Sequence, residues 1–271
     1  RRRDTPGLVG KALGYETACD EISFILGPVI AGILVGVLGP NPALLVLMTW
    51  VVVGQGCFIA YLVSRRGMRV DTQTPTPTDG TAPRIRLKAV LPPMLACLCV
   101  GTVFGSTQTA LTAINAARGT DAYTGIIYGF MGLGSAVASV LVSRFPERVP
   151  LAWREAGGAL LVVLVSVLLL PVPGSVGLAL LFTVIGLGVG SILVSAYTRG
   201  ERVAPSHRIA SVMTMLTTCL VLGVSFGSAL GGVLSVVPRH GFLLTLGAGV
   251  AALLVSVAIH ATRPPGRRRD V

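Results

Sequence analysis

Long apolar stretches, separated by short polar or basic segments, constrain this chain more than any other feature of its sequence. A helix that spans a bilayer needs about 20 mostly apolar residues. Eight stretches approach or exceed that length, although the fifth is short unless it starts near Trp153: residues 12–38, 43–64, 88–112, 122–143, 156–171, 175–198, 209–237 and 241–262. They lack the alternation of barrel strands. The sequence therefore predicts an all-α polytopic membrane protein with about eight transmembrane helices.

The composition supports this class and argues against several others. Only 12% of the residues are charged, whereas a soluble domain has about 25%. The net charge of +11 does not indicate nucleic-acid binding, because the basic residues occur in short runs between apolar stretches. The five cysteines all fall in apolar segments, are odd in number and form no CxxC pair. Neither a disulfide framework nor a metal site is therefore expected, and no cofactor is implied.

The basic residues also predict an orientation. If the N-terminus is cytoplasmic and eight helices alternate, the cytoplasmic segments carry 20 of the 22 Lys and Arg residues. The external turns carry only Arg118 and Arg239. Such a strong positive-inside bias supports both the helix count and cytoplasmic placement of both ends. The expected location is a cell membrane (plasma or inner), crossed several times.

An internal repeat indicates a duplicated helical unit. Residues 27–34 (GPVIAGIL) align without a gap on residues 227–234 (GSALGGVL), and these copies lie on the first and seventh predicted helices. A unit of six helices follows from that separation. Because the long polar linker comes after the second helix and no initiator Met is present, we expect four further helices upstream. The expected organisation begins with the last two helices of an N-terminal six-helix half (1–64) and a cytoplasmic linker (65–87). A C-terminal six-helix half (88–262) and a basic cytoplasmic tail (263–271) follow.

Six plus six helices, a long basic central linker and cytoplasmic ends resemble the major facilitator superfamily of transporters. Residues 24–34 look like the fifth-helix motif of that superfamily, in which Gly-Pro is followed by small residues. Gly27 and Gly32 would let a neighbouring backbone approach closely, and Pro28 would bend the helix. The resemblance implies that this helix packs against the other half and helps to seal or hinge the cavity. The corresponding small residues of the second copy are Gly227, Gly231 and Gly232.

A second resemblance lies in the predicted cytoplasmic loop after residue 141. Leu141, Arg144 and Arg148 agree with the superfamily's loop signature, Gly-x-Leu-Ala-Asp-Arg-x-Gly-Arg-Arg. Ser143 stands where the signature has its acid, and Ser139 and Pro146 replace its glycines. In the family the acid and arginine form a latch on the cytoplasmic face. Without the acid, two interpretations stay open: Arg144 contributes to a latch, or it only anchors the helix end at the lipid headgroups.

Three acids within the first predicted span are candidates for proton coupling: Glu16, Asp20 and Glu21. Asp20 lies about 13 Å along a helix from Lys11. An acid at that depth must face protein or a watery cavity, where desolvation favours its neutral form. The alternative is that this helix extends into the cytoplasm and the acids are solvated, or paired with N-terminal or linker arginines.

Neutral polar residues within the predicted helices are candidates for a central cavity. They are Gln55, Gln108, Asn115, Tyr128 and Tyr197. Each could equally form a hydrogen bond between helices.

The resemblance implies alternating access, in which two halves rock about a central site, without a cofactor and driven by a proton gradient. The expected partners are the lipid bilayer, a small-molecule substrate, protons and the missing N-terminal helices. Export of a small amphipathic compound is favoured, because the expected cavity lacks fixed positive charge. The alternatives are a complete eight-helix channel or scaffold, and a membrane-embedded enzyme. No HExxH, GxSxG or Walker sequence supports an enzyme or an ATP-driven pump.

Overall fold

The computed structural model describes residues 23, 26–64, 85–143, 149–205 and 208–261, and within these it contains helices and no strand. A helix at Leu26–Leu38 precedes the labelled elements. The others are α2 (Pro40–Ser64), α3 (Leu87–Arg118), α4 (Tyr123–Ser143), α5 (Leu151–Leu169), α6 (Ser175–Val203), α7 (Ile209–Leu234), the 3-10 turn η2 (Pro238–His240) and α8 (Gly241–Ala261). The expected all-α fold class is confirmed.

Seven of the described helices, α2 to α8, are long and apolar enough to cross a membrane. Together with Leu26–Leu38 they correspond one by one to the eight predicted spans, although residues 12–22 of the first span lie outside the described residues. At three ends the helix continues beyond the predicted span. Helix α3 continues to Arg118, α5 begins at Leu151 instead of residue 156, and α6 continues to Val203. The predicted boundaries followed hydropathy, which falls near charged residues even where the helix goes on.

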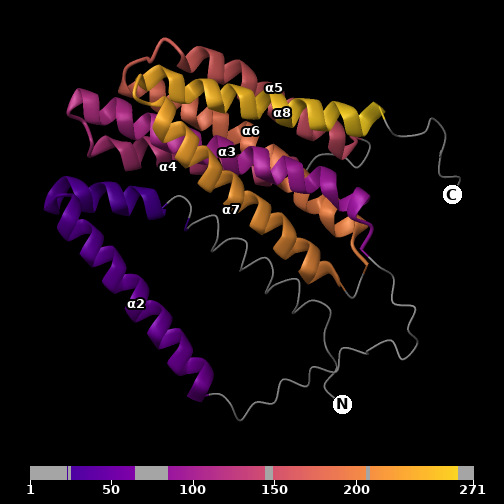
Figure 1. The fold of residues 1–271 in the computed structure, drawn as a ribbon, viewed down its shortest axis with the longest axis horizontal. Coiled ribbons are helices and arrows are strands. Elements are labelled where there is room, and N and C mark those ends of the chain that lie inside the picture. The colour runs from indigo at the N-terminus through magenta and orange to yellow at the C-terminus, as the bar shows by residue number, and fades with distance from the viewer. Residues whose placement is uncertain (1–22, 24–25, 65–84, 144–148, 206–207, 262–271) are drawn as a thin grey trace, which may run out of the picture.

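Helices α3 to α8 pack against one another, and we call them the α3–α8 bundle (Figure 1). Helix α3 packs mainly against α7 and α8, whereas α6 packs mainly against α4 and α5. Helices α3 and α6 also contact each other and carry the most buried residues of the bundle. Phe182 of α6 and Phe242 of α8 are fully buried and meet edge to face, with ring centroids 6.4 Å apart. The core therefore lies along α3 and α6.

Small residues let some of these helices approach to backbone contact. A Cβ placed at Gly223 of α7 would lie 3.0 Å from the Cα of Gly101 on α3. A Cβ placed at Gly134 of α4 would lie 3.2 Å from the Cα of Gly186 on α6. Neither contact leaves room for a side chain. The α3–α7 and α4–α6 interfaces therefore use glycine to bring helix backbones together.

Polar contacts show which turns share an end of the bundle. Arg118, at the end of α3, donates to the carbonyl oxygens of Val172 (3.0 Å) and Pro173 (3.1 Å) in the turn between α5 and α6. The α3–α4 and α5–α6 turns therefore lie at one end. At the other end, Arg154 near the start of α5 donates to the carbonyl oxygen of Val142 near the end of α4 (3.2 Å). Successive helices of the bundle thus run in alternating directions.

The two helices that precede the bundle are much less buried. Leu26–Leu38 contacts α4, where a Cβ placed at Gly32 would lie 2.9 Å from the Cα of Gly125. Gly39, with a φ of +81°, makes the turn into α2. Helix α2 lies away from the bundle (Figure 1), and Ala43 is its one buried residue. Large apolar side chains such as Trp50, which is 63% exposed, therefore cover α2 on all sides.

Candidate functional site

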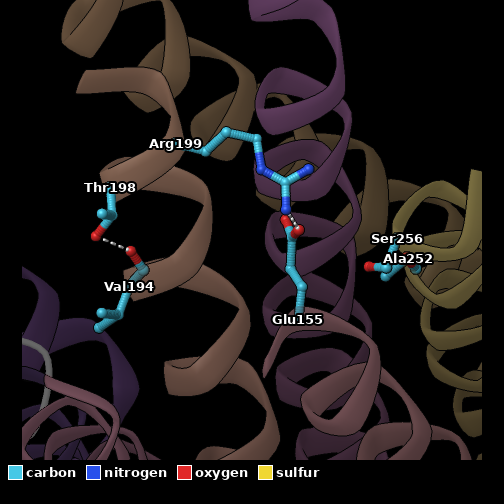
Figure 2. Close-up of polar contacts among 6 residues, drawn as sticks. All are labelled: Glu155, Val194, Thr198, Arg199, Ala252 and Ser256. Carbon is cyan, nitrogen blue, oxygen red and sulfur yellow. Dashed lines mark hydrogen bonds and ion pairs between the residues drawn. The ribbon is translucent and has the colours of Figure 1, made fainter. Parts of the chain in front are cut away.

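The most unusual polar feature of the described helices is a buried ion pair between α5 and α6. The Nη2 atom of Arg199 donates to the Oε2 atom of Glu155. Glu155 is fully buried and Arg199 is 8% exposed. Figure 2 shows the carboxylate of Glu155 directed at the guanidinium of Arg199. A single buried charge is costly, whereas a hydrogen-bonded pair of opposite charges offsets part of that cost.

Helices α5 and α6 pack closely about one helical turn from the Glu155–Arg199 pair, and this packing positions the pair. A Cβ placed at Gly158 of α5 would lie 2.6 Å from the carbonyl oxygen of Gly188 and 3.0 Å from the Cβ of Ser191, both on α6. Because α5 and α6 run in opposite directions, Glu155 lies beside the part of α6 just after Ser191. Arg199 follows in that direction, so its long side chain reaches back to the carboxylate.

Two further buried hydroxyl groups belong to the elements around the pair. Ser195 lies four residues before Arg199, on the same face of α6, and its Oγ is buried and has no hydrogen-bond partner among the described residues. Ser256 lies on α8, which packs against α5, and its hydroxyl donates to the carbonyl oxygen of Ala252 (2.9 Å; Figure 2). The Oε1 atom of Glu155 likewise accepts no hydrogen bond from the described part of the chain.

The sequence did not predict this pair, because one predicted span began too late and the other ended too early. Glu155 immediately precedes the span predicted from residue 156, and Arg199 immediately follows the span predicted to end at residue 198. In the structure both residues lie inside helices. The signal that could have found Glu155 was Trp153: a helix that starts near that residue includes the acid.

The predicted cavity residues occupy different environments. Asn115 of α3 is fully buried and donates from Nδ2 to Oγ1 of Thr124 (2.9 Å). Buried Tyr128 of α4 donates to the carbonyl oxygen of Phe104 (3.4 Å). The Tyr197 hydroxyl lies 3.1 Å from Oγ1 of Thr217 on α7. Gln55 and Gln108 are exposed. Asn115, Tyr128 and Tyr197 therefore each make a contact between neighbouring elements. The structure does not bring the five predicted cavity residues together.

Both copies of the repeat contribute close contacts, although not at every glycine. Gly32 meets Gly125 of α4, and a Cβ placed at Gly231 would lie 3.1 Å from the Cα of Ser106 on α3. Gly227 faces the carbonyl oxygen of Thr102 at similarly close range, and the carbonyl oxygen of Pro28 faces Gly125. A Cβ at Gly27 or Gly232 would meet none of the described residues of other segments within 4 Å. Close packing is thus concentrated at particular positions of each copy.

Several candidates lie outside the described residues. They are the acids Glu16, Asp20 and Glu21 of the first predicted span, and Arg144 and Arg148 of the loop motif. Their predicted roles stay predictions.

A cavity of about 400 Å³ lies between α4, α5 and α6. Its walls are mainly apolar, with Trp153, Arg154 and Ser191 contributing the polar groups, and neither Glu155 nor any predicted cavity residue lines it. Within the described ranges no group of three or more His, Cys, Asp or Glu side chains could hold a metal ion.

Apolar spanning helices, packed through small residues around a buried charge pair, define this chain as a multi-pass membrane protein. The family model of the Major Facilitator Superfamily matches residues 5–228, which is most of the chain. The chain therefore belongs to that superfamily and is a membrane transporter of its kind, as the resemblance of its motifs predicted. Among curated proteins, none is similar enough to this chain to count as a match.

Proposed function

We propose that this protein moves a small solute across a cell membrane by secondary active transport with alternating access. The observation that carries the proposal is the superfamily match over residues 5–228, which coincides with a set of spanning helices. In transporters of this type, two helical halves rock about a site near the bilayer midplane. No cofactor is needed, because an ion gradient supplies the free energy.

The proposed orientation places both chain ends in the cytoplasm. The contact of Arg118 with Val172 and Pro173 supports it, because this contact assigns two turns with few basic residues to one end of the bundle. The basic segments around residues 144–154 and 199–208 then belong to the opposite end, as the positive-inside rule requires of a cytoplasmic face. A plasma or inner membrane is the proposed location.

The proposed organisation is two six-helix halves, of which residues 88–262 form one and residues 1–64 the end of the other, joined by the linker 65–87 and followed by the tail 263–271. The nearly complete exposure of α2 supports this division. A helix with apolar side chains on all sides can face lipid or other apolar helices. We assign one side of α2 to helices of the first half that precede residue 1, and the rest to lipid.

Protons are the proposed coupling ions, and Asp20 and Glu21 the proposed carriers, with Glu16 less important. Residues such as Asn115, Tyr128 and Tyr197 are proposed to border the solute path where helices separate. A small amphipathic compound moving outward is the proposed substrate and direction. Support for this comes from the mainly apolar character of the helices, since a pathway without fixed charge suits such a solute.

The test is a screen for transport by the complete protein in everted membrane vesicles. A panel of radiolabelled amphipathic compounds is added, and respiration is used to acidify the vesicle interior. We expect at least one compound to accumulate in vesicles that contain the protein and to leak out when the proton gradient is collapsed. Accumulation that survives collapse of the gradient, or that requires ATP, would contradict the proposal.

A further inference from the structure

We propose that the cavity between α4, α5 and α6 binds an anionic phospholipid of the cytoplasmic leaflet, with an acyl chain in the cavity and the phosphate at Arg154. This inference goes beyond solute transport. It uses the proposed orientation of the bundle to assign the leaflet, and it needs no other part of the proposed function.

The cavity is a groove that opens to the side of the bundle. Helices α4 and α5 both pack on α6 but scarcely on each other, so α6 forms the floor between them. The groove has a volume of about 400 Å³, and Leu141, Trp153 and Gly157 on its walls are exposed. Because these walls belong to membrane-spanning helices, lipid has direct access to the groove.

The floor and walls of the groove suit an acyl chain. Leu187 and Ser191 of α6 form the floor. The Ser191 hydroxyl donates to the carbonyl oxygen of Leu187 (2.9 Å), so it is satisfied within its own helix. A Cβ placed at Gly157 would meet none of the described residues of other segments within 4 Å. The wall that α5 contributes therefore leaves room for a ligand at this position.

The groove faces away from the helix that precedes α2. That helix, Leu26–Leu38, contacts α4 at Gly125. At about 100° per residue, Leu141 lies roughly 160° around α4 from Gly125. The proposed solute path runs between the two halves, on the Gly125 side of α4. The groove lies on the other side, which is the side available to lipid.

A positive charge at the mouth of the groove favours an anionic headgroup. Arg154 lies on the first turn of α5, and its Nε and Nη1 atoms donate to the carbonyl oxygens of Val149 and Val142 (both 3.2 Å). These contacts hold the guanidinium between the end of α4 and the start of α5. Carbonyl oxygens carry no formal charge, and a guanidinium is well suited to bind phosphate.

The level of this mouth in the membrane also suits a headgroup. Trp153 precedes Arg154 and is 56% exposed, and exposed tryptophans at the ends of spanning helices lie at the level of the headgroups. The proposed orientation places this end in the cytoplasm, where the leaflet carries anionic lipids and basic pockets between helices bind their headgroups. A choline headgroup is less suitable, because its own positive charge would lie near Arg154.

Titration of the complete, delipidated protein in detergent, followed by native mass spectrometry, tests this proposal without the solute. We expect the first phosphatidylglycerol to bind about fivefold more tightly than the first phosphatidylcholine, the factor expected of one basic residue near anionic lipid. Arg154→Gln should remove this preference, whereas Arg154→Lys should keep it. The control Arg202→Gln, at an exposed arginine of α6 near the same end, should also keep it.

A second variant tests the groove itself and keeps the test decisive if Arg154→Gln does not fold. Gly157→Leu places a side chain where the acyl chain lies, so tight binding of the first phosphatidylglycerol should be lost. Gly247→Leu on α8 is the matched control, because Gly247 is also exposed and a Cβ there would meet no described residue of another segment within 4 Å. This control should bind phosphatidylglycerol like the wild type.

Several outcomes would overturn the inference. They are equal binding of the two lipids by the wild type, an unchanged preference in Arg154→Gln, and wild-type binding in Gly157→Leu. Displacement of phosphatidylglycerol by the transported compound would also overturn it, because the groove would then be a solute site. If the lipid binds as expected but no solute is moved, the proposed transport fails while the lipid site stands.

Discussion

At the scale of single residues, the Glu155–Arg199 pair shows how an apolar bundle tolerates two charges. Each charge is acceptable only because the other is present, as isolated ions in such surroundings are far more costly than a hydrogen-bonded pair. The sequence reveals both residue types but not their pairing, since 44 residues separate them. Only the antiparallel packing of α5 and α6 through Gly158 and Gly188 brings them together.

A double-mutant cycle tests the energetic part of this account. Glu155→Met or Arg199→Met should each lower the free energy of unfolding by about 3–5 kcal/mol, because one buried charge remains without its partner. The double variant, which buries two apolar side chains of similar length, should recover most of that loss. Thermal unfolding in detergent is the measurement. Additive losses in the double variant would show that the two charges do not stabilise each other.

The acids of the first predicted span give a second prediction at this scale. In the complete protein, Asp20→Asn and Glu21→Gln keep the size of the side chain but remove its proton. We expect loss of gradient-driven accumulation with solute exchange largely intact, and a smaller effect for the corresponding change at Glu16. Vesicle transport at several pH values measures both activities. Full, pH-dependent accumulation in both variants would show that these acids are a solvated or salt-bridged helix end.

At the scale of helices, the sequence predicted the existence and order of the elements well and their ends poorly. Apolar runs of about 20 residues leave little choice of structure inside a membrane, so every predicted span has a counterpart. Helix α3 continues as far as Arg118, and α5 and α6 include Glu155 and Arg199. Each of these charged residues has a partner that a hydropathy pattern does not show. Interactions that the sequence does not show therefore explain why these helix ends and the Glu155–Arg199 pair were not predicted.

The glycine repeat was visible in the sequence, but the glycines that touch a neighbour were not distinguishable from those that do not. Gly231 lies close to Ser106, whereas the described part of the chain places no atom of another segment within 4 Å of a Cβ at the adjacent Gly232. Gly32 and Gly27 differ in the same way. Which face of a helix meets a partner is decided by packing. The sequence motif thus identified the contact surface only to within one helical turn.

This difference supplies matched pairs of variants. Gly231→Leu and Gly32→Leu should each abolish transport or assembly, because a large side chain enters a backbone contact. Gly232→Leu and Gly27→Leu add the same side chain where there is room and should leave both largely unchanged. All four should insert into the membrane, since leucine favours the bilayer. Transport assays and size-exclusion profiles would refute the packing account if the two members of each pair behaved alike.

At the scale of the whole molecule, the alternating directions of α3 to α8 agree with the uneven distribution of basic residues. The contacts of Arg118 and of Arg154 group the turns into two ends, and the sequence assigns most of the positive charge to one of them. Hydropathy therefore predicted the alternating helices, whereas the assignment of the basic end to the cytoplasm stays a prediction. Neither pattern predicted the position of α2, which lies away from the bundle with Ala43 as its one buried residue (Figure 1).

Reporter fusions test this topology in cells. Cytoplasmic signals are expected after Arg69, Arg148, Arg202 and Arg268, and external signals after Asn41, Gly119 and Arg239. The physical reason is that lysine and arginine resist translocation across the membrane. One reversed reporter would contradict the count of eight spans and, with it, the division into six-helix halves.

The central claim, proton-driven transport of a solute, is tested most directly by following protons and solute together. The complete protein is reconstituted into liposomes that contain a pH-sensitive dye, and the compound identified in the vesicle screen is added. We expect proton movement that begins only when the compound is present, runs opposite to it, and drives it against its own concentration gradient. Ion conductance that is independent of the compound, as in a channel, would contradict the account.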